Sequence, residues 1–102
     1  MVVNQGQDVE KEVFKLVETY NGRSLFSRKR FELRHDTDLN EDFRMAPEDA
    51  YELMESYVDK FDINPKTIHF ERYFPESFSD PHDPLTIQLL IDSANAGRWL
   101  GK

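Results

Sequence analysis

One loop segment of the chain carries oxygen ligands at the spacing of a calcium-binding loop. Asp36, Asp38 and Asn40 occupy the first, third and fifth positions of such a loop. The sixth position requires a glycine and holds Glu41, and the twelfth requires a bidentate glutamate and holds Pro47. The segment therefore does not predict a calcium site.

The remaining ligand and nucleophile types are scattered. His35, His69 and His82 do not have the spacing of a zinc site, and the absence of cysteine removes thiolate ligands and disulfides. No serine has the sequence context of an activated nucleophile, and no glycine-rich loop could cradle a phosphate. We therefore expect no catalytic residue, no metal and no cofactor, and predict that the protein is not an enzyme.

Four carboxylates form the most distinctive charged pattern in the sequence. Glu48, Glu52, Glu55 and Asp59 are spaced four, three and four residues apart, with no lysine or arginine between them. On a helix this spacing places them on one face, where like charges repel. The pattern fits either a solvated helix face or a docking site for a basic surface of another protein.

The helix that positions these carboxylates is the clearest in the chain. Pro47 suits a first helical position, and Glu48 and Asp49 meet the positive end of the helix dipole. Apolar residues recur at steps of three and four, which predicts one buried stripe over 47–63. The residues of this stripe are Ala50, Leu53, Met54, Tyr57, Val58 and Phe61.

Two further helices and one short helix are predicted around it. The first begins after Asp8 and ends at Asn21-Gly22, with residues 1–7 frayed. A short helix is expected near 67–74, where a strand is the alternative. The last helix begins after Thr86 and ends at Gly97.

These elements predict an all-α fold, a small helical bundle of three main helices plus a short one with a long first loop. The chain of 102 residues is expected to form one domain, 1–102. Trp99 and Leu100 are expected to fold back on the core. No apolar run approaches the about 18 residues of a membrane span, and the N-terminus lacks the features of a signal peptide, so we expect a cytoplasmic protein.

The long loop has a basic first half and an acidic second half. The acidic half contains Asp36, Asp38, Glu41 and Asp42, and the two halves are expected to neutralise each other. A nucleic-acid patch is the alternative, but a net charge of -7 makes nucleic acid an unlikely partner, because surplus carboxylate repels a phosphate backbone. The basic residues concerned are Arg23, Arg28, Lys29, Arg30 and Arg34.

The order of elements resembles that of acyl carrier proteins. The resemblance lies in Asp38-Leu39, in Asp49-Ala-Tyr-Glu52-Leu53 and in Phe61-Asp62-Ile63. A small bacterial family of unknown function with this carrier-like fold resembles the chain over nearly its whole length. The matching segments are Ser24-Leu-Phe, Asp49-Ala-Tyr-Glu-Leu-Met-Glu, Arg72-Tyr-Phe-Pro75, Pro84-Leu-Thr86 and Ala96-Gly-Arg-Trp99.

The chain departs from acyl carrier proteins at the position that holds their phosphopantetheine arm. Counting back from Phe61-Asp62-Ile63 places Pro47 where those proteins have the serine, and no serine or threonine occurs from Asp38 to Glu55. The resemblance thus implies the fold and an acidic docking face without the arm. The leading hypothesis is a non-enzymatic, carrier-like protein that binds a basic partner through Glu48, Glu52, Glu55 and Asp59. The alternative is a functional acyl or peptidyl carrier with an atypical attachment site.

Overall fold

A computed structural model describes residues 5–21, 31–77 and 80–101. It contains three α-helices, α1 (Gln5–Glu18), α2 (Pro47–Phe61) and α3 (Ile87–Ala96), and two short 3-10 helices, η1 (Pro65–Thr67) and η2 (Phe70–Arg72). No β-strand forms in these ranges. Their backbone contains one isolated β-bridge, between Asp38 and Thr86. The predicted all-α class with three main helices is confirmed.

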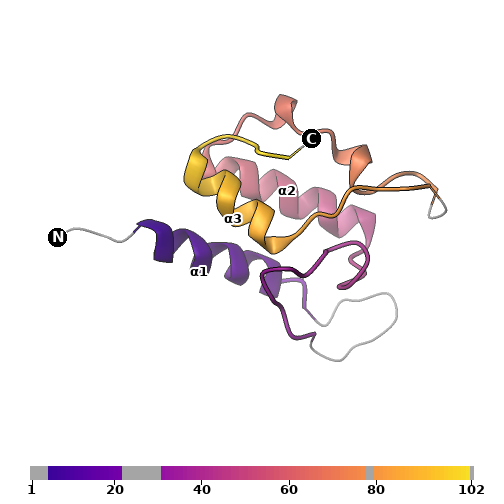
Figure 1. Cartoon of the computed structure of the whole chain (residues 1–102), viewed down its shortest axis with the longest axis horizontal. Coiled ribbons are helices and arrows are strands. Elements are labelled where there is room, and N and C mark those ends of the chain that lie inside the picture. The colour runs from indigo at the N-terminus through magenta and orange to yellow at the C-terminus, as the bar shows by residue number, and fades with distance from the viewer. Residues whose placement is uncertain (1–4, 22–30, 78–79, 102) are drawn as a thin grey trace.

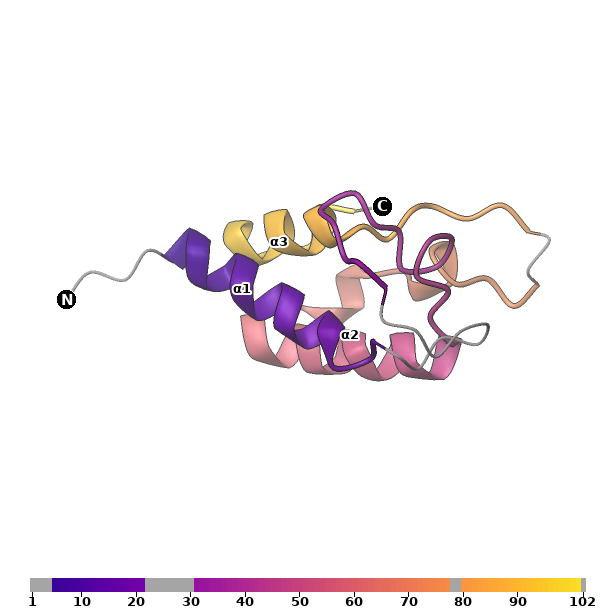
Figure 2. The ribbon, with the colours of Figure 1, turned by 90° about the horizontal axis from the view of Figure 1, so that it is seen from below.

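The three α-helices pack around one core. In Figure 1, α3 passes in front of α2, and the view turned by 90° shows α1 running diagonally from the side of α3 to the side of α2 (Figure 2). α1 contacts both other helices. Residues 31–46 lie at the end of the bundle where α1 ends and α2 begins (Figure 1). In this arrangement, one side of α2 faces outward.

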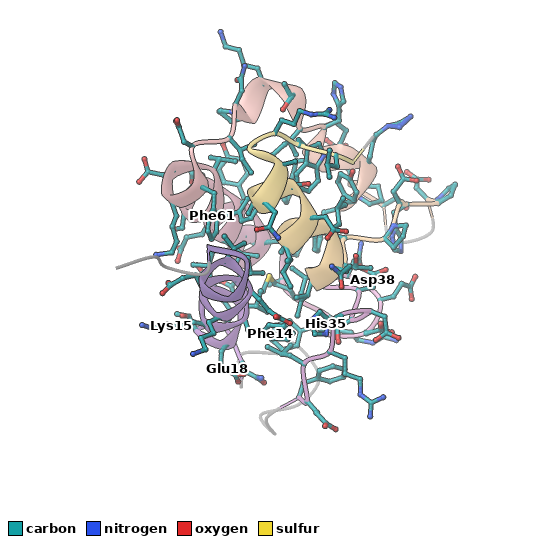
Figure 3. All side chains as sticks on the ribbon, turned by 60° about the vertical axis from the view of Figure 1, so that its left-hand side comes forward. Phe14, Lys15, Glu18, His35, Asp38 and Phe61 are labelled. Carbon is teal, nitrogen blue, oxygen red and sulfur yellow. The ribbon has the colours of Figure 1, made fainter. Side chains whose placement is uncertain are left out.

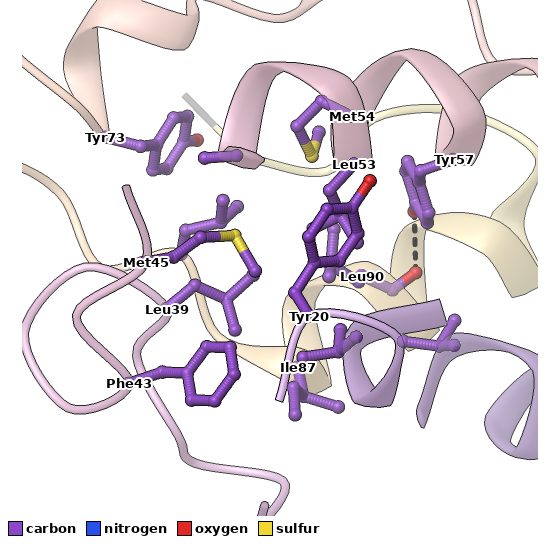
Figure 4. Packing of buried hydrophobic residues seen from close by; sticks show 14 of the residues in the cluster. Tyr20, Leu39, Phe43, Met45, Leu53, Met54, Tyr57, Tyr73, Ile87 and Leu90 are labelled. Carbon is purple, nitrogen blue, oxygen red and sulfur yellow. Dashed lines mark hydrogen bonds between the residues drawn. The ribbon is translucent and has the colours of Figure 1, made fainter. Parts of the chain in front are cut away.

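The core is built from the apolar stripes of the three helices together with the long loop (Figure 4). The predicted stripe of α2 faces inward, since Leu53 and Tyr57 have no exposed surface, whereas Val58 and Phe61 are half-buried at its margin. The Tyr57 hydroxyl donates a hydrogen bond of 2.6 Å to the carbonyl oxygen of Leu90, which joins α2 to α3. Further core residues are Val13, Val17, Leu39, Phe43, Met45, Ala50, Met54, Ile87 and Leu90.

The ends of α2 and α3 follow the predicted signals. Pro47 is the first residue of α2. The Thr86 side chain accepts a hydrogen bond of 3.1 Å from the backbone N–H of Leu89, so Thr86 caps α3 as expected. Gly97 ends α3 with a φ of 73°, a left-handed conformation that glycine adopts without steric cost.

The start of the first helix differs from the prediction. α1 begins at Gln5, so residues 5–7 are helical rather than frayed, while residues 1–4 lie outside the described residues. Helix propagation adds one backbone hydrogen bond for each residue that is fixed, and no proline interrupts this stretch. α1 ends at Glu18, and a turn follows through Asn21.

The region after α2 forms two separate turns instead of one short helix. Asn64 caps η1 by accepting a hydrogen bond of 3.0 Å from the backbone N–H of Lys66. Ile68 then has an extended backbone, which separates η1 from η2. The alternative, a strand, does not form over these residues either.

The expectation for the C-terminal segment was half correct. Trp99 packs into the core and is 6% exposed, whereas Leu100 is 42% exposed. The backbone N–H of Leu100 donates a hydrogen bond of 3.0 Å to the Ser93 hydroxyl, which fixes the segment against α3. Trp99 is thus part of the core, whereas the side chain of Leu100 lies at the surface.

Candidate functional site

The outward side of α2 carries all four carboxylates that the sequence singles out. Glu48, Glu52, Glu55 and Asp59 are exposed, because the opposite side of the helix faces the core. We call these four residues the acidic face. Their exposure follows from the same periodicity that buries the apolar stripe.

Most carboxylates of the acidic face lack a cationic partner, whereas several carboxylates elsewhere have one. In the part of the chain that the structure describes, Glu48, Glu55 and Asp59 form no ion pair, and Glu52 accepts a hydrogen bond of 2.8 Å from the Tyr20 hydroxyl. Lys60, the basic residue in the last turn of α2, instead lies 3.0 Å from Glu12 on α1.

The charge of Lys60 is therefore directed away from the acidic face. Its hydrogen bond holds the pKa of the Glu12 carboxyl below the usual value. Other acidic groups also have cationic or histidine partners: Arg72 lies 3.7 Å from Asp83, and His82 lies 2.8 Å from Glu41. The acidic face is thus an outward-facing group of carboxylates that the described residues leave without a cation.

An open depression lies along the C-terminal half of this surface. Glu52, Glu55 and Asp59 line it, whereas Glu48 does not. Among the other lining residues are Tyr51 and Asp62, which the acidic pattern of the sequence does not include. Tyr51 could have been found from its spacing of four from Glu55, but Asp62 lies beyond the helix, where its left-handed φ of 55° sets its direction.

In the segment that resembles a calcium loop, Asp38 and Asp42 accept hydrogen bonds from backbone N–H groups. Oδ1 of Asp38 accepts hydrogen bonds from the backbone N–H groups of Asn40, at 2.9 Å, and Leu85, at 3.3 Å. Asp42 accepts a further bond of 2.9 Å from the N–H of Asp38. Asp38 is 8% exposed, so these contacts satisfy a buried carboxylate and tie the loop to the start of α3.

The three histidines lie apart, each beside a glutamate. His35 contacts Glu10 and meets the ring of Phe14 edge-on, with centroids 5.1 Å apart (Figure 3). The hydrogen bond that the His82 ring donates to Glu41 raises the pKa of His82, whose side chain is only 13% exposed. Within the described ranges, no group of three or more histidine, aspartate or glutamate residues could hold a metal ion.

The basic half of the long loop falls largely outside the described residues. The residues concerned are Arg23, Arg28, Lys29 and Arg30. The expected neutralisation of the basic half by the acidic half depends on them and therefore also lies outside the described residues. Arg34 is described; its side chain is 71% exposed and lies 3.8 Å from Glu32.

None of the helices in the described residues is long and apolar enough to span a membrane. Comparison with protein families matches residues 6–102 to the family described as "Protein of unknown function (DUF1493)". No curated protein and no solved structure matches the chain.

Proposed function

This chain belongs to the DUF1493 family of proteins of unknown function, and we propose that it is a non-enzymatic protein that binds a basic surface of another protein through the acidic face of α2. The observation that carries the proposal is the exposure of Glu48, Glu55 and Asp59 without an ion-pair partner among the described residues. Lysine or arginine side chains on a partner would relieve their mutual repulsion on docking.

The overall charge supports a basic protein partner. With a net charge of -7, the chain produces a negative field that steers cationic surfaces toward it and repels nucleic acid. Carboxylates on the rim of a contact act mainly on the association rate and on the register of docking. The acidic face would therefore select a partner by charge, whereas other contacts would determine how long the complex lasts.

We also propose that the scaffold is carrier-like and has no phosphopantetheine arm. The support is the order of its elements: a first helix, a long loop, an acidic helix ending at Phe61, short turns, and a last helix opened by Thr86. Pro47, at the first position of α2, has no hydroxyl group to which an arm could be attached. On this proposal, the resemblance to acyl carrier proteins concerns the docking face and not acyl transfer.

The docking proposal is tested by reversing two charges. The immobilised protein and its Glu55→Lys/Asp59→Lys variant would capture proteins from an extract of the source cells, with quantification by mass spectrometry. We expect at least one basic protein to be retained by the wild type and lost by the variant. With the purified partner, binding should weaken about tenfold at low salt and by less at high salt, because ions screen exposed charges.

A matched control separates the acidic face from net charge. Asp36 and Asp92 are exposed carboxylates away from α2, and the Asp36→Lys/Asp92→Lys variant has the same net charge as the test variant. It should retain the partner. Equal losses in both variants, or unchanged affinity and salt dependence in the test variant, would remove the proposal.

The absence of an arm has its own test. The intact mass of the protein would be measured after co-expression with a promiscuous phosphopantetheinyl transferase. We expect an unmodified mass. An added phosphopantetheine would instead support the alternative, a functional carrier with an atypical attachment residue.

A further inference from the structure

A small apolar hollow lies between α2 and the turns that follow it. Tyr51, Met54 and Val58 form its α2 wall, at spacings of three and four residues. Its opposite wall comes from Pro65, Ile68 and Phe70, and Glu55 completes the lining. Its volume is about 160 Å³. An apolar space of about 150 Å³ accommodates a benzene-sized group, so one bulky apolar side chain would fit.

The walls of the hollow are held in place by the fold. The ring of Phe70 meets Tyr51 edge-on, with centroids 5.7 Å apart, and stacks on Phe74 at 5.3 Å. Phe74 is 7% exposed and Met54 is 6% exposed, so both sides of the hollow are continuous with the core. A side chain that enters would therefore meet a preformed surface and would not have to order it.

Tyr51 is the part of this wall that reaches solvent. It is 57% exposed, which is unusual for a large apolar residue in this fold, where the core tyrosine Tyr57 is fully buried. Aromatic residues in such positions are common anchors of protein interfaces. Their value in binding comes from burying apolar area that water otherwise covers.

Charge determines which occupant suits the hollow. Glu55 lines both the hollow and the acidic depression, which continues along Glu52, Asp59 and Asp62. An apolar side chain next to lysine or arginine would satisfy both surfaces at once. A carboxylate or phosphate headgroup would instead be repelled by this border.

We propose that the hollow receives one bulky apolar side chain of a basic amphipathic segment of the partner protein, while the lysine or arginine residues of that segment contact the acidic face. This proposal rests on the proposed function and defines the partner more narrowly. Charge would steer the segment, and the apolar side chain would anchor it.

The test uses two synthetic helical peptides of about 16 residues, long enough to form helix. Both contain the same lysines in an alanine background, and they differ only in a central leucine or alanine. Binding to the full chain would be measured by calorimetry. We expect the leucine peptide to bind about tenfold more tightly, because its side chain leaves water. Its addition should shift the methyl NMR signals of Met54, Val58 and Ile68, whereas the alanine peptide should leave them unchanged.

Three variants identify the site. Tyr51→Ala should abolish the preference for leucine without changing the affinity for the alanine peptide. Tyr51→Phe, which retains the ring, and Leu100→Ala, which removes another exposed apolar side chain, should keep the preference.

The outcomes separate the two proposals. If Glu55→Lys/Asp59→Lys weakens both peptides but the wild type does not discriminate between them, the anchoring proposal is wrong and the docking proposal stands. If neither peptide responds to the charge reversal, or neither binds, both proposals are overturned. A preference for leucine that survives Tyr51→Ala, or unchanged methyl signals in the wild type, also rejects the hollow as the anchor site.

Discussion

The hydroxyl group of Tyr20 donates a hydrogen bond of 2.8 Å to Oε1 of Glu52, so a residue just beyond α1 holds one carboxylate of the acidic face. Tyr20 is 5% exposed, and its ring packs in the core. Glu52 therefore has a structural contact that Glu55 and Asp59 do not have among the described residues. This is why the charge reversals that test docking are placed at Glu55 and Asp59.

Removing the Tyr20 hydroxyl should destabilise the fold modestly. We expect Tyr20→Phe to lower the free energy of unfolding by about 1 kcal/mol, because a hydrogen bond to a charged group is lost at a partly buried site. Urea denaturation would measure the change. Tyr51→Phe, at an exposed tyrosine, should change stability by less than about 0.5 kcal/mol. Equal effects of the two substitutions would contradict a stabilising role for the Tyr20–Glu52 contact.

Of the two large apolar side chains of the C-terminal segment, only Trp99 should contribute strongly to stability. Trp99 meets Tyr73 edge-on at 5.8 Å and Tyr57 at 6.3 Å. We expect Trp99→Ala to cost about 3–5 kcal/mol, as large-to-small changes in a core do. Leu100→Ala should cost less than about 0.5 kcal/mol, because the side chain is exposed. Thermal unfolding followed by circular dichroism would compare them, and similar losses would show that the two residues are not buried as described.

Burial of Tyr57 should make the fold sensitive to alkali. Burial raises the pKa of its phenol above the usual value of about 10. At a pH between the unfolded-state pKa and the raised folded-state pKa, the unfolded chain has released this proton and the folded chain has retained it. Stability therefore falls as the pH rises above about 10. Tyr57→Phe should be less stable than the wild type at neutral pH by about 1 kcal/mol, because the bond to Leu90 is lost.

The stability deficit of Tyr57→Phe should shrink above pH 10, since the variant has no phenol to titrate at this position. Urea unfolding of both proteins from neutral to alkaline pH would show this. A deficit that stays constant across the range would contradict the account.

His82 should make stability depend on pH near neutrality. Its hydrogen bond with Glu41 raises its pKa in the folded state, so the folded chain binds the proton more tightly than the unfolded chain does. This contribution is fully present below the unfolded value of about 6.5 and is lost as the pH rises through the folded-state pKa. We expect it to be less than about 1 kcal/mol, because the Glu41 side chain is 63% exposed.

The measurement compares the wild type with His82→Gln. The stability difference should decrease as the pH rises from just below to well above neutrality, and Glu41→Gln should remove the same pH-dependent part. A difference that does not vary with pH, or a pH dependence that persists in Glu41→Gln, would exclude this pair as its source.

The sequence alone determined the features that depend on neighbours within a few residues. The apolar and acidic faces of α2, the proline at its start, and the Thr86 and Gly97 boundaries of α3 were all predicted, because helix periodicity and capping act over three or four residues. The all-α class follows from these elements. The exposure of the acidic face follows as well, since a helix that buries one side presents the other to solvent.

The tertiary structure decided what depends on residues far apart in the chain. Periodicity contains no information on the bond between Tyr20 and Glu52 or on the approach of Phe70 to Tyr51, because both require the chain to fold back on itself. The burial of Trp99 and the exposure of its neighbour Leu100 also depend on how the C-terminal segment packs against the core. The acidic face was therefore visible in the sequence, whereas the apolar hollow beside it exists only in the folded protein.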